Sequence, residues 1–227
     1  MKSIQTKLTV IVLLIFLVAM SILGGLNYWR ARSIITEEIT TSMQKEAVNS
    51  AQDMNEWLKS RKLELTMLAS NPVMQGGSLQ EIMPVLAAAQ NTNKAYEGIV
   101  YADRYGMSCS ATGFKVSVAD KLFFKHAMQG ESFIADPATS RQTGKLIATV
   151  AVPVKSNGVV VGVLFGPMSM EELTKKVLNI KVGQTGYAYV LQADGLAIFH
   201  PDQEIAMKYN ALKDEKTSPI MRSLLIQ

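Results

Sequence analysis

The chain begins with a long run of apolar residues. No charged residue occurs from Leu8 to Leu26, and a helix of this length just crosses the roughly 30 Å hydrocarbon core of a bilayer. The run is followed by Tyr28-Trp29-Arg30, an aromatic and cationic cluster typical of a membrane interface. We therefore predict a transmembrane helix over residues 8–29, with a tail, residues 1–7, in the cytoplasm.

A cleaved signal peptide is the competing interpretation of this segment. Ala19-Met20-Ser21 loosely fits the small-x-small pattern of a cleavage site. The apolar run continues past Ser21 to Leu26, which favours an uncleaved anchor.

Apolar residues then recur at intervals of three, four and seven, which predicts a long helix over residues 30–72. Asn71-Pro72 ends it, because the residue before a proline disfavours helical geometry. The apolar stripe is richer in Met and Ala than a regular coiled-coil heptad, so we expect it to pack on its own domain and on a second copy, giving a homodimer. Its members are Ile35, Ile39, Met43, Ala47, Ala51, Met54, Leu58, Leu65 and Leu68.

Two shorter helices are also predicted. Ser78 and Glu81 have the spacing of a capping box, and the amphipathic segment after them tolerates Pro84 near its first turn. A later helix covers Met170 to Leu178, with Ser169 as the expected N-cap.

The rest of the pattern consists of short β-branched or alternating runs joined by turn residues. Residues 98–102 and 107–111 form one expected hairpin, and residues 145–154 and 159–165 form a second around Ser156-Asn157-Gly158. Residues 186–191 and 196–200 form a third around Asp194-Gly195. The fold class is therefore mixed α and β with antiparallel sheets.

Charge and cysteine usage narrow the function. The net charge is only +4 and no basic run occurs, which argues against nucleic acid as a partner. Cys109 cannot form an internal disulfide, and we interpret it as a small buried strand residue. With His126 and His200 as the only histidines, neither a metal-site spacing nor a cofactor motif is present.

The order of several motifs resembles a double Cache domain. These motifs are Asp120-Lys121-Leu122-Phe123-Phe124, Thr143-Gly144-Lys145, Val152-Pro153-Val154, Gly183-Gln184-Thr185-Gly186-Tyr187-Ala188-Tyr189, and His200-Pro201-Asp202. The resemblance implies two PAS-like α/β modules along one helix, as in the sensor halves of methyl-accepting chemotaxis receptors and of some histidine kinases and diguanylate cyclases. It implies a membrane-distal, ligand-binding module over residues 73–180 and a proximal module over residues 181–227.

Members of the family continue from the second module into another membrane helix and a cytoplasmic signalling region. The sequence ends shortly after His200-Pro201-Asp202. We therefore expect an incomplete second module, and we expect this chain to bind a ligand without signalling alone.

Two other function classes, an enzyme and a solute-binding protein, are alternatives to a sensor. His200 and Asp202 suggest a catalytic base with its orienting group, but no nucleophile in a recognisable setting accompanies them, and a structural role is favoured. A membrane-tethered solute-binding protein would share the ligand pocket without needing the long helix. We expect binding and no enzyme activity.

The resemblance also implies a ligand site, with one departure from the family pattern. Members that bind amino acids carry Arg-x-Trp-Tyr where this chain has Lys121-Leu122-Phe123-Phe124, and the Asp expected to hold the ligand ammonium is replaced by the run Phe165-Gly166-Pro167. An amino acid held in the usual way is therefore doubtful, and a small carboxylate or another compact polar metabolite is expected. Lys121 would be its charge partner, Tyr101, Phe123 and Phe124 its aromatic surroundings, and Asp136, Ser140 or Arg141 the closing loop groups.

Overall fold

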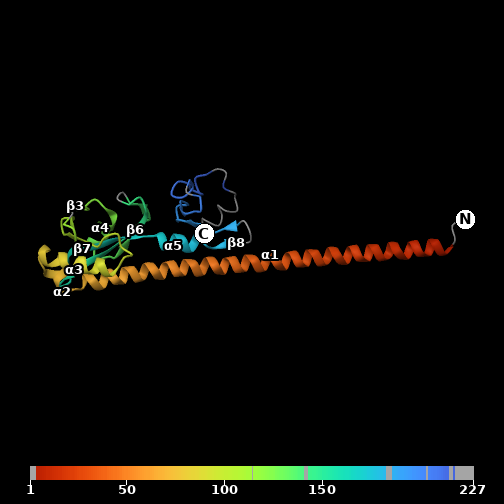
Figure 1. Cartoon of the computed structure of the whole chain (residues 1–227), viewed down its shortest axis with the longest axis horizontal. Helices are drawn as coiled ribbons and strands as arrows, with labels where there is room; N and C mark the ends of the chain where they lie inside the picture. The colour runs from red at the N-terminus through yellow and green to blue at the C-terminus, as the bar shows by residue number, and fades with distance from the viewer. Residues whose placement is uncertain are drawn as a thin grey trace. The chain divides into compact units, whose positions relative to one another are not determined.

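The computed structural model describes residues 4–113, 115–140, 143–182, 186–202, 204–214 and 217. The chain divides into two compact units, residues 1–52 and residues 53–227. The first consists of the N-terminal part of the helix α1, which runs without interruption from Ile4 to Ala69 (Figure 1). The predicted transmembrane and stalk segments are therefore consecutive parts of one helix.

The helix α1 ends at Ala69, as the proline at position 72 requires. Asn71 then caps a short helix, α2 (Pro72–Gly76), through its side-chain oxygen, which accepts the Val73 N–H at 2.9 Å. Pro72 opens this helix, where its missing N–H is harmless. The break was predicted, but the new helix that follows it was not.

The next helix, α3 (Leu79–Thr92), confirms the capping box. The Glu81 carboxylate accepts both the backbone N–H and the hydroxyl of Ser78, each at 2.8 Å. Pro84 lies inside the helix near its start, and Ile82 and Leu86, four residues apart, are buried on one face.

A seven-stranded antiparallel sheet follows, with strand order β3-β2-β1-β7-β6-β4 and with β5 also pairing with β6. The predicted hairpin turns are confirmed: Gly106 lies between β1 and β2 at φ 81°, and Asn157 (φ 48°) and Gly158 (φ 81°) connect β6 to β7. Positive φ at both central residues is what a two-residue turn between twisted strands demands. The strands are β1 (Val100–Asp103), β2 (Met107–Ser110), β3 (Lys115–Ser117), β4 (Phe133–Ile134), β5 (Ala138–Thr139), β6 (Leu146–Ser156) and β7 (Val159–Ser169).

Successive side chains along a strand point to opposite faces of the sheet, and both faces of this sheet carry apolar side chains. Helices pack on both faces. On one face, the α1-side core joins the end of α1, α2 and α3 to the sheet, and Leu65, Leu86, Val152 and Leu164 belong to it. On the other face, the helix α4 (Leu122–Met128) packs on β6 and β7. This α4-side core consists of Ala102, Val118, Phe124, Ala127, Ala151, Val163 and Phe165.

The chain then forms α5 (Glu171–Leu178) and four short strands, β8 (Lys181–Val182), β9 (Gly186–Tyr187), β10 (Val190–Leu191) and β11 (Ala197–Phe199). The N-cap of α5 is Met170 rather than the predicted Ser169. Ser169 still takes part, since its hydroxyl accepts the Glu171 N–H at 3.3 Å. The predicted hairpin is present between β10 and β11, with Gly195 in its turn at φ 88°.

Candidate functional site

A cavity of about 530 Å³ lies on the α4 face of the sheet. Its walls are largely apolar, and hydroxyl groups and one carboxylate are interspersed among them. A volume of this size suits a small metabolite, and apolar walls with a few polar groups are the usual composition of a ligand site. The described lining residues are Gln90, Glu97, Gly98, Val100, Ser108, Ser110, Thr112, Val116, Val118, Thr139, Ser140, Ile147, Phe165 and Pro167.

The strand register explains why these residues meet. Val100 in β1 pairs with both Ser110 in β2 and Phe165 in β7, so the three side chains lie side by side on one face. The strand β5 contributes Thr139 through its pairing with Leu146 in β6. The cavity thus combines the sheet face with the segment that follows α4.

The helix α4 packs on the same face of the sheet as the cavity and contacts one of its wall residues. Phe124 and Ala127, three residues apart, are its buried residues. The Phe123 ring is half-buried, and its centroid lies 5.0 Å from that of Phe165, which lines the cavity. Of the two predicted aromatic residues in α4, Phe123 thus reaches the cavity wall through Phe165, while Phe124 is a core residue.

Lys121 lies at the N-cap of α4 and is half exposed. Its ammonium nitrogen is 2.9 Å from a carboxylate oxygen of Asp120, and this hydrogen bond holds the pKa of that carboxyl below its ordinary value. Lys121 is not among the described residues that line the cavity.

The remaining predicted site residues are dispersed. Tyr101 lies in the α1-side core, on the opposite face of the sheet from its neighbour Val100, and burial raises the pKa of its phenol. Asp136 is exposed between β4 and β5. Arg141 lies outside the described residues. Ser140 is buried and lines the cavity.

Glu97 is a cavity residue that the sequence reasoning missed. Its carboxylate accepts hydrogen bonds from the hydroxyls of Ser140, at 3.0 Å, and Thr143, at 2.5 Å. These partners lie 43 and 46 residues further along the chain. A glutamate in a loop carries no local signal of such a role, because only the long-range fold brings the three residues together.

His200 has a structural setting. Its Nδ1 accepts the Asp202 N–H at 3.0 Å, and its ring packs edge-on near the rings of Tyr187 and Tyr189. Across the described part of the chain, no three His, Cys, Asp or Glu side chains gather as metal ligands would. Cys109 is a buried free thiol in β2, as predicted.

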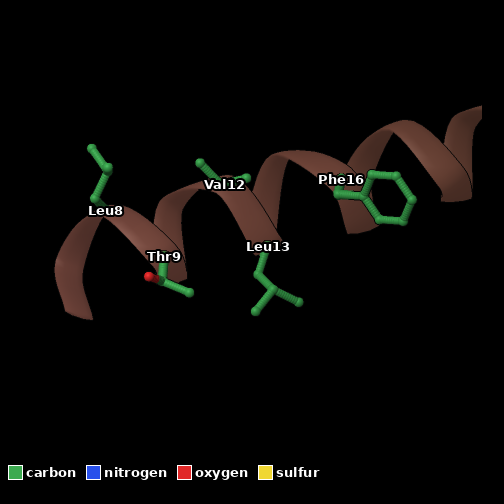
Figure 2. Close-up of a pocket in the computed structure, with 5 residues that line it drawn as sticks. All are labelled: Leu8, Thr9, Val12, Leu13 and Phe16. Carbon is green, nitrogen blue, oxygen red and sulfur yellow. The ribbon is translucent and has the colours of Figure 1, made fainter. Parts of the chain in front are cut away.

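The N-terminal part of α1 exposes its apolar side chains. Figure 2 shows a shallow hollow on this helix between Leu8, Thr9, Val12, Leu13 and Phe16. All five residues come from one helix, and Leu8, Val12, Leu13 and Phe16 are each more than half exposed. This part of α1 is long and apolar enough to cross a membrane, although a signal sequence passes the same test.

The comparisons with known proteins agree with this architecture. Residues 31–222 match the Cache domain family. The chain therefore belongs to the Cache domain family. It is similar to the methyl-accepting chemotaxis protein PscA of Pseudomonas syringae pv. tomato, at 22% identity over 89% of this chain and 33% of that protein. It is also similar to the methyl-accepting chemotaxis protein McpA of Bacillus subtilis, at 25% identity over 89% of this chain and 32% of that protein.

Solved structures share the fold. The ligand-binding domain of the chemoreceptor PctC of Pseudomonas aeruginosa, in complex with GABA, has a TM-score of 0.68 at 20% identity, covering 76% of this chain and 79% of that one. The ligand-binding domain of the chemoreceptor CtaA of Pseudomonas fluorescens, in complex with L-isoleucine, has a TM-score of 0.65 at 23% identity, covering 80% and 76%. The predicted fold class is confirmed, while the chain spans about a third of the length of the two chemotaxis proteins it matches.

Proposed function

We propose that this chain is the sensing part of a membrane-anchored chemoreceptor and that it holds a small molecule in the cavity between the sheet and the segment that follows α4. The observation that carries the proposal is the cavity itself. It has the volume of a metabolite site, an apolar wall of Val100, Phe165 and Pro167, and a set of hydroxyls beside one carboxylate. The family membership and the names of the chemotaxis proteins that match support a sensory role.

The proposed site has two parts. The first consists of the cavity residues, including Ser140, with Phe123 supporting the wall through Phe165. The second is Lys121, whose role as partner of a ligand carboxylate rests on its motif position. For that role its ammonium must leave Asp120 and bind the ligand. This exchange costs little free energy, because ion pairs at exposed positions contribute little to stability. Tyr101, Asp136 and Arg141 complete the set predicted from the motifs. The geometry supports Tyr101 and Asp136 less, and Arg141 lies outside the described residues.

The apolar N-terminal segment determines where the proposed sensor lies relative to the membrane. We propose that residues 8–29 cross the membrane, that residues 1–7 lie in the cytoplasm, and that residues 30–227 face the periplasm or exterior. The long stalk helix would pair with a second copy, and the modules over residues 73–180 and 181–227 would form the double Cache arrangement. A ligand that changes the distal module would shift α1 by a small amount, and a coupling of about 1–3 kcal/mol suffices for a response.

Two related roles use the same architecture. The sensor part of a histidine kinase or a diguanylate cyclase would differ only in its output region, and a tethered solute-binding protein would deliver its ligand to a transporter. Loss of uptake on deletion of the gene, with chemotaxis intact, would favour the transport role.

Titration calorimetry of the full chain in lipid nanodiscs, against organic acids, amino acids, amines and purines, tests the proposal. We expect saturable binding of at least one compact polar compound, weakened by Ser140→Ala and by Phe165→Ala. Binding that is unaffected by both substitutions would move the site elsewhere, and the absence of any ligand across all four classes would contradict a sensory cavity.

The Lys121 assignment has its own test, using a ligand that carries a carboxylate. Lys121→Ala should weaken that ligand by about 1.5–3 kcal/mol, the contribution of a charge-assisted hydrogen bond. Lys125→Ala, one helical turn along, is the matched control. Equal affinity in Lys121→Ala and in the unsubstituted chain would show the assignment to be wrong.

A further inference from the structure

The segment before β1 carries one extra residue relative to β7. Tyr96 pairs with Met168 across an isolated bridge, and Val100 pairs with Phe165. Four positions separate the two residues on the β1 side, whereas three positions separate their partners in β7. An extra residue of this kind forms a β-bulge, which interrupts the alternation of side chains along a strand and turns one of them to the other face.

The bulge turns two consecutive residues toward the cavity. Glu97 and Gly98 both line it, while their neighbours Tyr96 and Ile99 both belong to the α1-side core. Glu97 contributes a carboxylate to the wall, whereas Gly98 contributes no side chain. The bulge therefore places a glycine at a position that faces the cavity.

Neither the backbone nor the packing requires glycine at position 98. The φ angle of Gly98 lies outside the left-handed region, so other residues can adopt its conformation. A Cβ at this position would lie 4.0 Å from Cγ2 of Val100, an ordinary van der Waals contact, and no other described atom beyond the adjacent residues lies within 4 Å. Gly166 differs, because a Cβ there would lie 2.6 Å from the Tyr96 ring. The missing side chain of Gly98 thus leaves open space in the cavity.

The surroundings of this open space are apolar. Val100 lies on the same face two residues along, and the Pro167 carbonyl accepts the Glu97 N–H at 2.8 Å, so both apolar residues lie beside it and both line the cavity. The Glu97 carboxylate is already engaged by the hydroxyls of Ser140 and Thr143. An alkyl group gains free energy in such a place, whereas a polar group without a hydrogen-bond partner loses it.

We propose that Gly98 determines the ligand specificity of the cavity by size. The open space beside Val100 receives an alkyl part of the ligand, and the residue at position 98 sets the longest alkyl chain that the cavity accepts. This inference rests on the proposed function and names the ligand class for that site, compact molecules that carry an alkyl group. A larger side chain at position 98 would occupy the space in place of the ligand.

The test measures how affinity depends on the alkyl chain, by calorimetry on the full chain in lipid nanodiscs. The probes are acetate, butanoate and hexanoate, together with ethylamine, butylamine and hexylamine, so that two different head groups carry the same chain lengths. Empty nanodiscs correct for partition into the lipid. We expect affinity to rise with chain length in at least one series, by about fourfold for each methylene that the cavity accommodates.

The variants are Gly98→Ala and Gly98→Leu, with Gly76→Leu as the matched control. Gly76 is exposed, and nothing lies within 4 Å of a Cβ there. Gly98→Leu should weaken the longest probe that binds by at least about 10-fold, as the discrimination of apolar pockets against excess length predicts, and should change the shortest by less than about twofold. Gly98→Ala should weaken the longest probe by about fourfold, the contribution of one methylene, and decides the test if Gly98→Leu does not fold. The control should leave both unchanged.

Equal losses for short and long probes in the Gly98 variants, or no loss for either, would overturn the role of Gly98 while leaving a sensory cavity intact. Binding confined to compounds without an alkyl chain, such as purines, would do the same. If no compound of either series or of the wider screen binds, the proposed function fails, and the role of Gly98 fails with it.

Urea unfolding tests the open space without a ligand. Gly98→Ala should have an unfolding midpoint at least as high as that of the unsubstituted chain, because alanine at a compatible position reduces the entropy of the unfolded state. A midpoint lowered as much as that of Gly166→Ala would show that position 98 has no room for a side chain, and it would overturn the inference.

Discussion

Tyr96 and Glu97 are neighbours in the chain whose side chains serve opposite faces of the sheet. The Tyr96 hydroxyl donates to the backbone carbonyl of Arg61 in α1 at 2.8 Å, while the Glu97 carboxylate accepts hydrogen bonds beside the cavity. A displacement of this segment on one face therefore acts on the other. The pair links the cavity wall to α1 through one peptide bond and the hydrogen bond of the Tyr96 hydroxyl.

The setting of Tyr96 reinforces this connection. Around its hydroxyl, the Arg61 guanidinium donates to Glu64 at 2.9 Å and to Asn93 at 3.2 Å, and the Asn93 amide donates to Glu64 at 2.6 Å. Tyr96 is only 5% exposed. A connected, partly buried polar network of this kind fixes one arrangement of α1 against the loop before β1.

Tyr96→Phe removes the hydroxyl and should lower the free energy of unfolding by about 0.5–1.5 kcal/mol, the net value of one hydrogen bond. Hydrogen exchange should also become faster at the α1 amides around Arg61. Tyr105→Phe is the control, because Tyr105 is 78% exposed. Urea unfolding and exchange mass spectrometry measure both effects, and a Tyr96→Phe protein as stable as the control would contradict the role of this hydrogen bond.

Alkaline pH should destabilise the second unit through the same residue. Burial, and then the charge of Glu64, raise the pKa of Tyr96 above its ordinary value of 10.0, although Arg61 acts in the opposite sense. At a pH between the ordinary tyrosine pKa and the raised pKa of folded Tyr96, the unfolded chain has lost the phenolic proton and the folded chain keeps it. The contribution of Tyr96 to the free energy of unfolding is therefore fully present below about pH 10 and is lost as the pH rises further.

The corresponding measurement is chemical unfolding from about pH 9 to pH 11, spanning the ordinary tyrosine pKa. The free energy of unfolding of Tyr96→Phe should fall less steeply over this pH range than that of the unsubstituted chain. Burial also raises the pKa of Tyr101. Both proteins should therefore keep some decrease of stability with pH. Identical slopes for the two proteins would show that Tyr96 titrates normally in the fold.

Gly166 is a third point of contact with Tyr96. A Cβ at position 166 would lie 2.6 Å from Cδ1 and 3.0 Å from Cε1 of the Tyr96 ring. Gly166→Ala should therefore push the ring away and cost about 1–3 kcal/mol, as overpacking of a core does. Gly76→Ala, where nothing lies within 4 Å of the added Cβ, is the control. A difference below about 0.5 kcal/mol between the two variants in urea unfolding would mean that the ring moves freely, because surface substitutions commonly have effects of that size.

The elements that the sequence predicted correctly are those specified by local chemistry. Asn157-Gly158 specifies a tight hairpin turn, Ser78 with Glu81 specifies a helix start, and Pro72 specifies a helix end. The short helix α2 was missed although its local cap, Asn71 before Pro72, was visible. Asn71-Pro72 was interpreted only as the end of the long helix and not as the start of a new one.

The site was harder to predict because it depends on sheet register and long-range pairing. Tyr101 was expected to line the pocket, but the strand period of two places it with Leu164, its partner in β7, in the α1-side core, while Val100 faces the cavity. The alternation of side chains along a strand predicts that Val100 and Tyr101 face opposite sides of the sheet. It does not predict which of the two faces the cavity. Glu97 could not be found at all without the fold, since its hydroxyl partners come from a loop beyond β5.

The remaining prediction concerns topology. We predict that the apolar part of α1 is an uncleaved anchor. A reporter enzyme active only outside the cytoplasm, fused after Ser70, should therefore be active and should sediment with membranes. A reporter active only in the cytoplasm, fused after Lys7, should also be active. Leu17→Arg places a charge in the middle of the apolar run, which costs about 2.5–3.5 kcal/mol on insertion scales, and should reduce the membrane-bound fraction. A soluble, shortened fusion product would instead indicate a signal sequence cleaved near Ala19-Met20-Ser21, and it would remove the proposed route by which α1 reports across the membrane.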